Sequence, residues 1–136
     1  MLYIDRIVLH NFKSFRHASI SFRKNFNCIV GPNGSGKSNV CDSLLFALGE
    51  SSLRRLRIVS PTQLLNEDVK KGRNEEMRRA YVKVIMGGDA NVEIIRYARE
   101  DRKMGYRLNG KHTTKQDVVE FLSPVITVLP ISIDVV

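Results

Sequence analysis

The sequence of 136 residues predicts an α/β fold, in which an antiparallel β meander packs beside a unit of one strand, one glycine-rich loop and one helix. Segments that alternate apolar and polar residues between turn residues predict the meander. A short, almost wholly apolar segment that leads into a glycine-rich loop and then into helically spaced apolar residues predicts the second unit. The length suits a single domain, and no segment has the roughly 18 consecutive apolar residues of a membrane span, so we expect no membrane partner.

The N-terminal part of the chain predicts three strands. Residues 2–12 are rich in β-branched and aromatic side chains, and residues 18–22 alternate apolar with polar ones, so we expect these two segments to pair as antiparallel strands. Residues 26–30, FNCIV, form a nearly continuous apolar run that ends at Gly31. Such a run is typical of a strand buried on both faces, and this one leads directly into the glycine-rich loop.

The segment after the glycines predicts a helix and a basic connector. Apolar side chains recur at helical spacing within residues 40–48, and Gly49 is suited to cap the C-terminal end of this helix. A Ser-Pro dipeptide at the start of residues 60–66 predicts a second, short helix. Residues 67–79 are charged and lack a clear period, so we expect them to form an exposed loop.

The second half of the sequence predicts two hairpins and a last helix. Residues 81–86 and 92–97 alternate in hydrophobicity on either side of a Gly-Gly-Asp turn. A strand near residues 106–108 meets Asn109-Gly110, a dipeptide favoured in type I′ turns because both central residues need a positive φ. The segment 114–122 begins with a threonine and continues with an amphipathic pattern, which predicts a capped helix.

The loop after the third strand fits the phosphate-binding pattern G-x-x-x-x-G-K-[ST] without a mismatch, between the strand and the helix that this motif requires. Its glycines let successive backbone N–H groups converge on a polyphosphate, and the helix N-terminus adds a favourable dipole. We expect Lys37 to reach the β- and γ-phosphates and Ser38 to ligate Mg²⁺; the alternative is a turn in which both are merely solvated. The motif residues are Gly31, Pro32, Asn33, Gly34, Ser35, Gly36, Lys37 and Ser38.

Hydrolysis of a nucleotide needs two further groups, a second acidic ligand for Mg²⁺ and a residue that positions the attacking water. The nearest candidate for the acidic ligand is Asp134, which follows the apolar residues 128–133. Pro130 and Ser132 are expected to prevent a strand there, and no glutamate follows the aspartate. The sequence therefore predicts nucleotide binding, and it assigns no catalytic residue.

Composition points to a polyanionic partner and away from metal or disulfide chemistry. The net charge of +8 favours DNA bound through its phosphates without sequence preference; the alternatives are a solvated basic surface or a fragment whose acidic remainder lies elsewhere. Cys28 and Cys41 lack the spacing of metal ligands, so we expect both to be small buried side chains. The N-terminus lacks the pattern of a signal peptide, which favours a cytoplasmic protein.

Several short segments form a distinctive set: Tyr3-Ile4, Asn11-Phe12-Lys13-Ser14-Phe15, residues 31–39, Asp42-Ser43 with Phe46-Ala47-Leu48-Gly49, and residues 106–111. As a set they resemble the N-terminal head segment of SMC (structural maintenance of chromosomes) proteins. The resemblance covers residues 1–122, which we interpret as an ATP-binding head lobe, and it leaves residues 123–136 as an atypical apolar tail.

This resemblance implies an ABC-type ATPase head that is divided along a long chain. The present lobe supplies the Walker A motif, and a C-terminal lobe, in cis or in trans, supplies the signature and Walker B motifs, so a missing catalytic carboxylate is expected. In the family, two heads sandwich two ATP molecules with Mg²⁺ and organise chromosomes on DNA, which implies a cytoplasmic, nucleoid-associated protein.

The resemblance also adds residues to the nucleotide site. It implies that Lys13, Ser14 and Asn39 lie near the nucleotide, and that Arg54 senses ATP or DNA. The alternatives are a solvated turn for Lys13 and Ser14 and an ordinary surface charge for Arg54.

The tail departs from the family pattern. Residues 123–136, SPVITVLPISIDVV, lack the glutamine and the heptads that family heads carry there. The chain could therefore be a complete protein, a single domain or a truncated frame. Other functions also stay open: the head lobe of a RecF-like or zinc-hook repair ATPase, a small-molecule kinase, which the early antiparallel strands disfavour, and a remnant that does not bind nucleotide.

Overall fold

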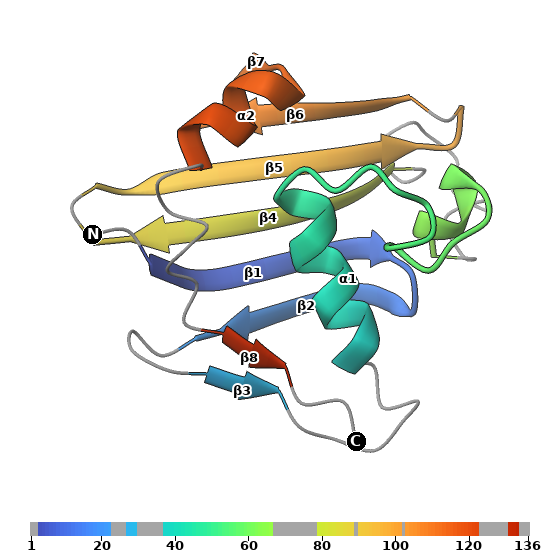
Figure 1. Ribbon diagram of the computed structural model, residues 1–136, viewed down its shortest axis with the longest axis horizontal. Coiled ribbons are helices and arrows are strands. Elements are labelled where there is room, and N and C mark those ends of the chain that lie inside the picture. The colour runs from blue at the N-terminus through green and yellow to red at the C-terminus, as the bar shows by residue number, and fades with distance from the viewer. Residues whose placement is uncertain are drawn as a thin grey trace.

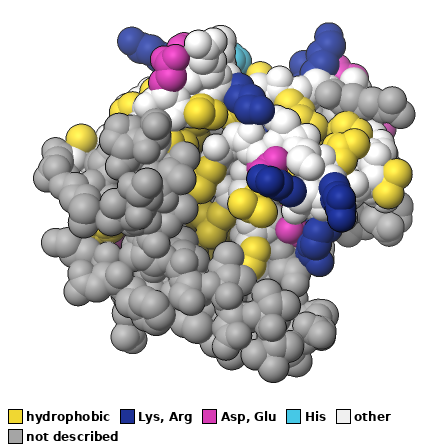
Figure 2. All heavy atoms as spheres, viewed as in Figure 1, with side chains coloured by type: hydrophobic (Ala, Val, Ile, Leu, Met, Phe, Trp, Pro, Cys, Tyr) yellow, Lys and Arg dark blue, Asp and Glu magenta, His cyan; other side chains and the backbone are white. Residues whose placement is uncertain are grey.

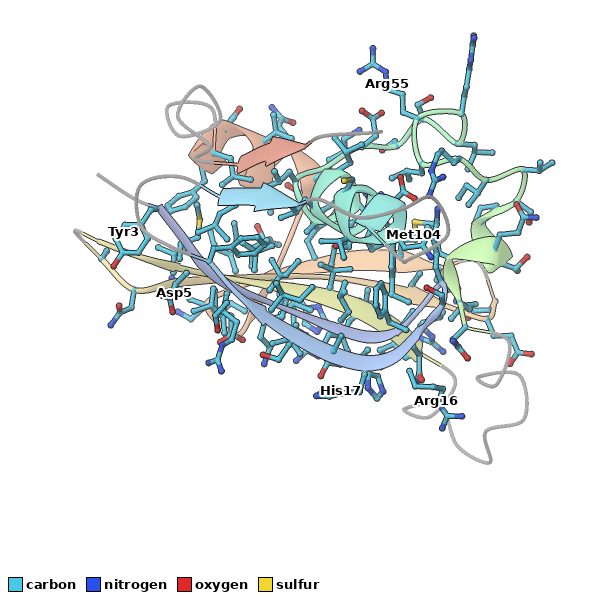
Figure 3. The ribbon with its side chains drawn as sticks, turned by 90° about the horizontal axis from the view of Figure 1, so that it is seen from below. Tyr3, Asp5, Arg16, His17, Arg55 and Met104 are labelled. Carbon is cyan, nitrogen blue, oxygen red and sulfur yellow. The ribbon has the colours of Figure 1, made fainter. Side chains whose placement is uncertain are left out.

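A computed structural model describes residues 3–22, 27–29, 37–66, 79–88, 90–101, 103–122 and 131–133, with only the backbone course for residues 27–29, 37–38 and 131–133. Six strands form an antiparallel sheet in the order β2-β1-β4-β5-β6-β7, and β3 and β8 form a separate parallel pair. The helix α1 and the β3–β8 pair lie on the same side of the large sheet (Figures 1 and 3). The elements are β1 (Tyr3–Phe12), β2 (Phe15–Ser21), β3 (Asn27–Ile29), α1 (Lys37–Ala47), the 3₁₀ helix η1 (Pro61–Leu64), β4 (Arg79–Gly87), β5 (Val92–Arg99), β6 (Met104–Leu108), β7 (Lys111–Thr113), α2 (Lys115–Leu122) and β8 (Ile131–Ile133).

The large sheet buries one face and leaves the other accessible. Side chains of β4 and β5 alternate strictly between buried and half-buried, as their sequence pattern predicts. The antiparallel pairing of β1 with β2 and of β4 with β5 is confirmed. The buried face packs against α1 and forms the core, whose sheet residues include Ile7, Leu9, Val82, Val84, Met86, Val92, Ile94 and Ala98.

Helix α1 ends at a glycine cap, as predicted. Gly49 has a φ of +108°, its N–H donates to the carbonyl of Phe46 at 3.2 Å, and the N–H of Glu50 donates to the carbonyl of Leu45 at 2.9 Å. This pair of bonds is the Schellman motif, which satisfies the last free carbonyls of a helix. A Cβ at position 49 would lie 3.2 Å from Val119 of α2, so the glycine also lets the two helices approach.

The predicted turn and cap in the C-terminal half are confirmed. Asn109 and Gly110 have φ angles of 50° and 83°, as a type I′ turn requires, and they join β6 to β7. The hydroxyl of Thr114 accepts a hydrogen bond from the N–H of Asp117 at 3.2 Å, which caps α2. Val118 on this helix is fully buried.

The segment around η1 is fastened to the turn between β1 and β2. The N–H of Lys13 donates to the carbonyl of Leu64 at 2.8 Å, and the N–H of Asn66 donates to the carbonyl of Asn11 at 2.7 Å. The amide of Asn66 also donates to the carbonyl of Lys13 at 2.8 Å. The exposed loop predicted for residues 67–79 lies outside the described residues, except for Arg79, which is the first residue of β4.

The prediction that no strand forms after residue 128 was wrong. Residues Ile131–Ile133 form β8, which pairs in parallel with β3 so that Asn27 lies opposite Ile131. Pro130 precedes the first residue of this strand and therefore removes no hydrogen bond from within the pair. Asp134 lies outside the described residues.

A buried arginine holds the C-terminal end of α1 to the sheet. Arg96 of β5 is 5% exposed and occupies an inward position between apolar neighbours on the strand. Its Nη1 donates to the carbonyl of Phe46 at 2.8 Å and to that of Glu50 at 2.6 Å. Its guanidinium carbon lies 4.2 Å from the ring centroid of Phe46 and 4.9 Å from that of Tyr106. Burial lowers the pKa of Arg96, and the negative end of the helix dipole offsets part of that cost.

We expect Arg96→Ala to lower the free energy of unfolding by about 3 kcal/mol, because two charge-assisted hydrogen bonds are lost and a cavity is left. Arg96→Met keeps most of the packing, so it should cost less than the alanine variant. Arg55→Ala, at a side chain that is 75% exposed, is the matched control and should change stability by no more than about 0.5 kcal/mol. Urea denaturation measures all three, and equal stabilities of the alanine variants would contradict this role for Arg96.

Candidate nucleotide site

The phosphate-binding motif lies between elements that the structure describes. Residues 31–36 are outside the described part of the chain, and for Lys37 and Ser38 only the backbone is described, as the first two residues of α1. The strand before the loop and the helix after it are both present, so the predicted context is confirmed. The first turn of α1 carries no acidic side chain to oppose an anion at the helix N-terminus.

The turn between β1 and β2 brings a lysine to α1. Lys13 has a φ of 49°, and its Nζ donates to Oδ2 of Asp42 and to the carbonyl of Leu56, both at 2.7 Å. The side chains of Lys13 and Asp42 are 10% and 4% exposed. This ion pair therefore links the turn to the second turn of α1 within the protein interior.

A second cation shares the same carboxylate. Nη2 of Arg57 donates to Oδ2 of Asp42 at 2.6 Å, and its Nε lies 3.1 Å from the same oxygen. This hydrogen bonding raises the pKa of Arg57. Because one carboxylate faces two cations, the cluster keeps one net positive charge beside the start of α1.

Asn39 connects this cluster to Ser14. Its Nδ2 donates to the hydroxyl of Ser14 at 2.7 Å, and its Oδ1 accepts a hydrogen bond from Nη2 of Arg57 at 3.2 Å. Asn39 follows the last motif residue directly, so these contacts lie at the first turn of α1. The structure thus brings together three of the residues that the resemblance implied, Lys13, Ser14 and Asn39.

Sequence reasoning did not single out Arg57, which contacts Asp42 and Asn39 from the loop after α1. The side chain of Arg54 is exposed, and within the described residues it makes no hydrogen bond or ion pair. Its carbonyl accepts a hydrogen bond from the N–H of Arg57 at 3.0 Å, and Arg57 has a φ of 58°. Nothing in a single sequence distinguishes these two arginines, because the tight turn after α1 determines which of their side chains reaches Asp42. Lys and Arg side chains gather around this loop on the face that carries α1 (Figure 2).

The arrangement fits a nucleotide polyphosphate with a metal ion. A helix whose first turn carries no acidic side chain and a cluster of net positive charge both favour an anion. The described residues include no group of three His, Cys, Asp or Glu side chains that could hold a metal by themselves. A bound Mg²⁺ would therefore depend on Ser38, on the phosphates and on groups outside this part of the chain.

Comparison with known proteins shows the family to which this chain belongs. A model of the RecF/RecN/SMC N-terminal domain matches residues 3–127. The chain belongs to this family. Its sequence is 40% identical over 126 residues to the chromosome partition protein Smc of Thermoplasma acidophilum, and 36% identical over 133 residues to structural maintenance of chromosomes protein 4 of Homo sapiens. These matches cover 89% of this chain and 10% of each relative, so the chain spans about a tenth of their length.

Solved structures agree with the family. An Smc head domain from Pyrococcus furiosus, bound to the C-terminal domain of ScpA, has a TM-score of 0.79 at 32% identity, over 90% of this chain and 33% of that one. A structure from work on ATP-driven dimerization and DNA-stimulated activation of SMC ATPases has a TM-score of 0.78 at 31% identity, over 91% and 80% of the two chains. The chain thus has the fold of the N-terminal segment of an SMC ATPase head. A RecF structure at 21% identity, with a TM-score of 0.65, shows a similar fold alone.

We expect Asp42→Asn to lower the free energy of unfolding by about 3 kcal/mol, because it leaves Lys13 buried without its carboxylate. Lys13→Met alone should also destabilise, since it leaves the carboxylate with only the half-exposed Arg57. The double variant should cost at least about 1 kcal/mol less than the sum of the two single changes. Urea denaturation of the four proteins measures this coupling, and simple additivity would refute a buried pair.

Proposed function

We propose that this chain is the ATP-binding N-terminal half of an SMC-type ATPase head, which works in chromosome organisation and segregation on DNA. The observation that carries the proposal is the phosphate-binding motif at the start of α1, beside the cluster formed by Lys13, Asn39, Asp42 and Arg57. The membership in the RecF/RecN/SMC family and the similarity to solved SMC heads support the same function.

In this proposal the chain binds and orients the nucleotide. The loop of residues 31–36 and the N-terminus of α1 direct backbone N–H groups at the phosphates of ATP, Lys37 contacts the β- and γ-phosphates, and Ser38 ligates Mg²⁺. Bound Mg²⁺ would supply charge neutralisation between the phosphates. Asp42 holds Lys13 and Arg57 in place, so that the positive charge of the cluster faces the polyphosphate. Because these long side chains are already ordered, binding costs less conformational entropy.

Arg54 has a separate place in the proposal. Its exposed side chain projects from the loop after α1, where it is accessible to a group that arrives from outside the lobe. We assign it the sensing of ATP or DNA, and we assign the direct support of the site to Arg57.

The proposed partners complete the site. A C-terminal SMC-type head lobe, in cis or in trans, supplies the signature and Walker B motifs, and a second head closes an ATP-sandwich dimer. The similar solved structures concern SMC ATPases that dimerise with ATP and respond to DNA, and a head that binds ScpA, which supports such assembly. The net charge of +8 supports sequence-independent DNA binding by a cytoplasmic, nucleoid-associated protein. In the described part of the chain, no helix is long and apolar enough to cross a membrane.

A RecF-like repair ATPase is the second candidate for the function. The family model includes RecF and RecN beside SMC proteins, and a RecF structure shares the fold. The lower identity to RecF, 21% against 32% for an Smc head, favours the SMC function.

We expect the purified chain to bind Mg-ATP weakly and to hydrolyse it negligibly, because it has phosphate donors without a complete hydrolytic site. Lys37→Ala should weaken binding about tenfold through loss of one charge-assisted contact, whereas Lys115→Ala, at an exposed lysine of α2, should leave the affinity unchanged. Titration calorimetry and a phosphate-release assay measure the two properties. Sustained turnover that Lys37→Ala abolishes would replace the half-site proposal with a self-sufficient ATPase or kinase.

We expect an SMC-type C-terminal lobe, added in trans, to raise the melting temperature of this chain and to restore hydrolysis in part. Among the described strands, β3 pairs with β8 alone, so a partner that extends this pair stabilises the folded state by mass action. Because residues 123–136 lack the expected glutamine, turnover should stay low until a family-like continuation replaces them. Differential scanning calorimetry and an ATP turnover assay test each step, with the native residues 123–136 and with the family-like replacement. If the added lobe does not raise the melting temperature, the chain is not half of a head. If the chain with its native residues 123–136 is fully active, these residues do not limit hydrolysis.

A further inference from the structure

A row of aromatic side chains crosses the face of the large sheet that points away from α1. We call these residues the aromatic row; strand pairing places them directly opposite one another on β2, β1, β4 and β5, in the order His17, His10, Tyr81 and Tyr97. The rings of His10 and Tyr81 are stacked with centroids 4.9 Å apart, and those of His10 and His17 meet edge to face at 6.2 Å. Figure 3 shows His17 and Arg16 on the side of the sheet opposite α1.

The row ends on a glycine of the next strand. Tyr97 pairs with Gly105 of β6, and a Cβ at position 105 would collide with Oη and Cζ of the tyrosine. The ring of Tyr97 therefore lies along the sheet surface, over the backbone of Gly105. The ring thus covers the glycine, and the guanidinium of Arg79 lies over the ring.

Cations flank the aromatic row on both sides. Lys83 follows Tyr81 by two residues on β4, and Arg107 lies opposite Ile95 on β5, so these two cations share one edge of the row. On the other edge, the guanidinium carbon of Arg79 lies 5.0 Å from the ring centroid of Tyr97. Together they surround a shallow hollow of about 200 Å³, lined by Arg79, Tyr81, Lys83, Ile95, Tyr97 and Arg107.

The charge of this hollow has one sign. Its lining includes three cations and two tyrosines and no carboxylate. The nearby Glu93 faces Lys83, with its Oε1 3.7 Å from Nζ. All three histidines of the chain belong to this face, because His112 pairs with Arg107, and its Nε2 lies 3.3 Å from Nη2 of that arginine.

We propose that this face binds single-stranded nucleic acid. Aromatic rings accept unpaired bases by stacking, while flanking cations neutralise the phosphates that connect those bases. A duplex keeps its bases within its own stack, so it could use only the cations and gains nothing from the aromatic row. The face shares no residue with the nucleotide site, and the proposal does not depend on ATP binding. DNA and RNA offer the same stacking chemistry, and the experiment distinguishes them.

The test measures binding of the whole chain to fluorescein-labelled dT20, rU20 and a 20-base-pair duplex by fluorescence anisotropy across a salt series. We expect both single strands to bind at least about tenfold more tightly than the duplex, and the tighter of the two identifies the preferred nucleic acid. The chain has four tyrosines and no tryptophan, so quenching of tyrosine emission by unlabelled oligonucleotide reports stacking directly. Tighter binding of the duplex would overturn the proposal.

Substitutions separate stacking from charge. The variant Tyr81→Leu/Tyr97→Leu should bind dT20 about tenfold more weakly and lose the quenching, whereas Tyr81→Phe/Tyr97→Phe should bind within about twofold of the wild type. If the leucine variant has a lower melting temperature but an unchanged affinity for dT20, the aromatic row only stabilises the sheet, and the proposal fails.

Matched charge variants complete the test. Arg79→Gln/Arg107→Gln should reduce the slope of log K against log salt by about 1.4, the value for two lost phosphate contacts with a single strand. Arg55→Gln/Lys115→Gln removes the same charge on the side of the sheet that carries α1, and it should leave the affinity for dT20 within about twofold. Equal losses in the two variants, or displacement of dT20 by polyglutamate as readily as by unlabelled dT20, would reduce the binding to net charge and overturn the proposal.

Discussion

The position of the Walker A helix, α1, depends on one constraint: charged side chains from three other parts of the fold contact it at its middle and at its C-terminal end. At the C-terminal end, Arg96 donates to the carbonyls of Phe46 and Glu50 from within the core. At the middle of the helix, Asp42 accepts hydrogen bonds from Lys13 of the β1–β2 turn and from Arg57 of the loop after α1. Because both contacts are largely buried, sliding or tilting the helix would leave charges without partners, at a cost of several kcal/mol.

This constraint explains how distant parts of the chain form one site. The turn that carries Lys13 and Ser14 is fastened by backbone hydrogen bonds to Leu64 and Asn66, near η1. The loop between α1 and η1 therefore has both of its ends held, and it delivers Arg57 to the same carboxylate as Lys13. A segment that the sequence presents as a basic connector thus contributes Arg57 to the cluster beside α1, which our proposal assigns to the nucleotide site.

The two faces of the sheet have separate roles in our proposals. The inner face is filled by apolar side chains and Arg96 and supports α1, whereas the outer face carries the aromatic row and its flanking cations. Strand alternation separates them, because neighbouring residues of one strand point to opposite sides. In β5, Arg96 and Tyr97 are adjacent in sequence. Arg96 nevertheless contacts the end of α1 on the inner face, whereas Tyr97 belongs to the proposed nucleic-acid site on the outer face. One sheet can therefore serve two ligands without a shared residue.

The sequence by itself determined the elements whose signals are local. Alternation predicted the hairpin of β4 and β5, the Asn109-Gly110 dipeptide predicted the turn between β6 and β7, and Gly49 predicted the end of α1. Each of these depends on the φ angles or the side-chain period of a few consecutive residues. The motif of residues 31–38 also predicted its own setting between strand and helix. Tertiary structure alone decided that Arg57 contacts Asp42, that Arg96 is buried, and that residues 131–133 pair with β3. These outcomes depend on partners distant in sequence: long-range contacts choose among chemically equivalent arginines, and no local pattern encodes that choice.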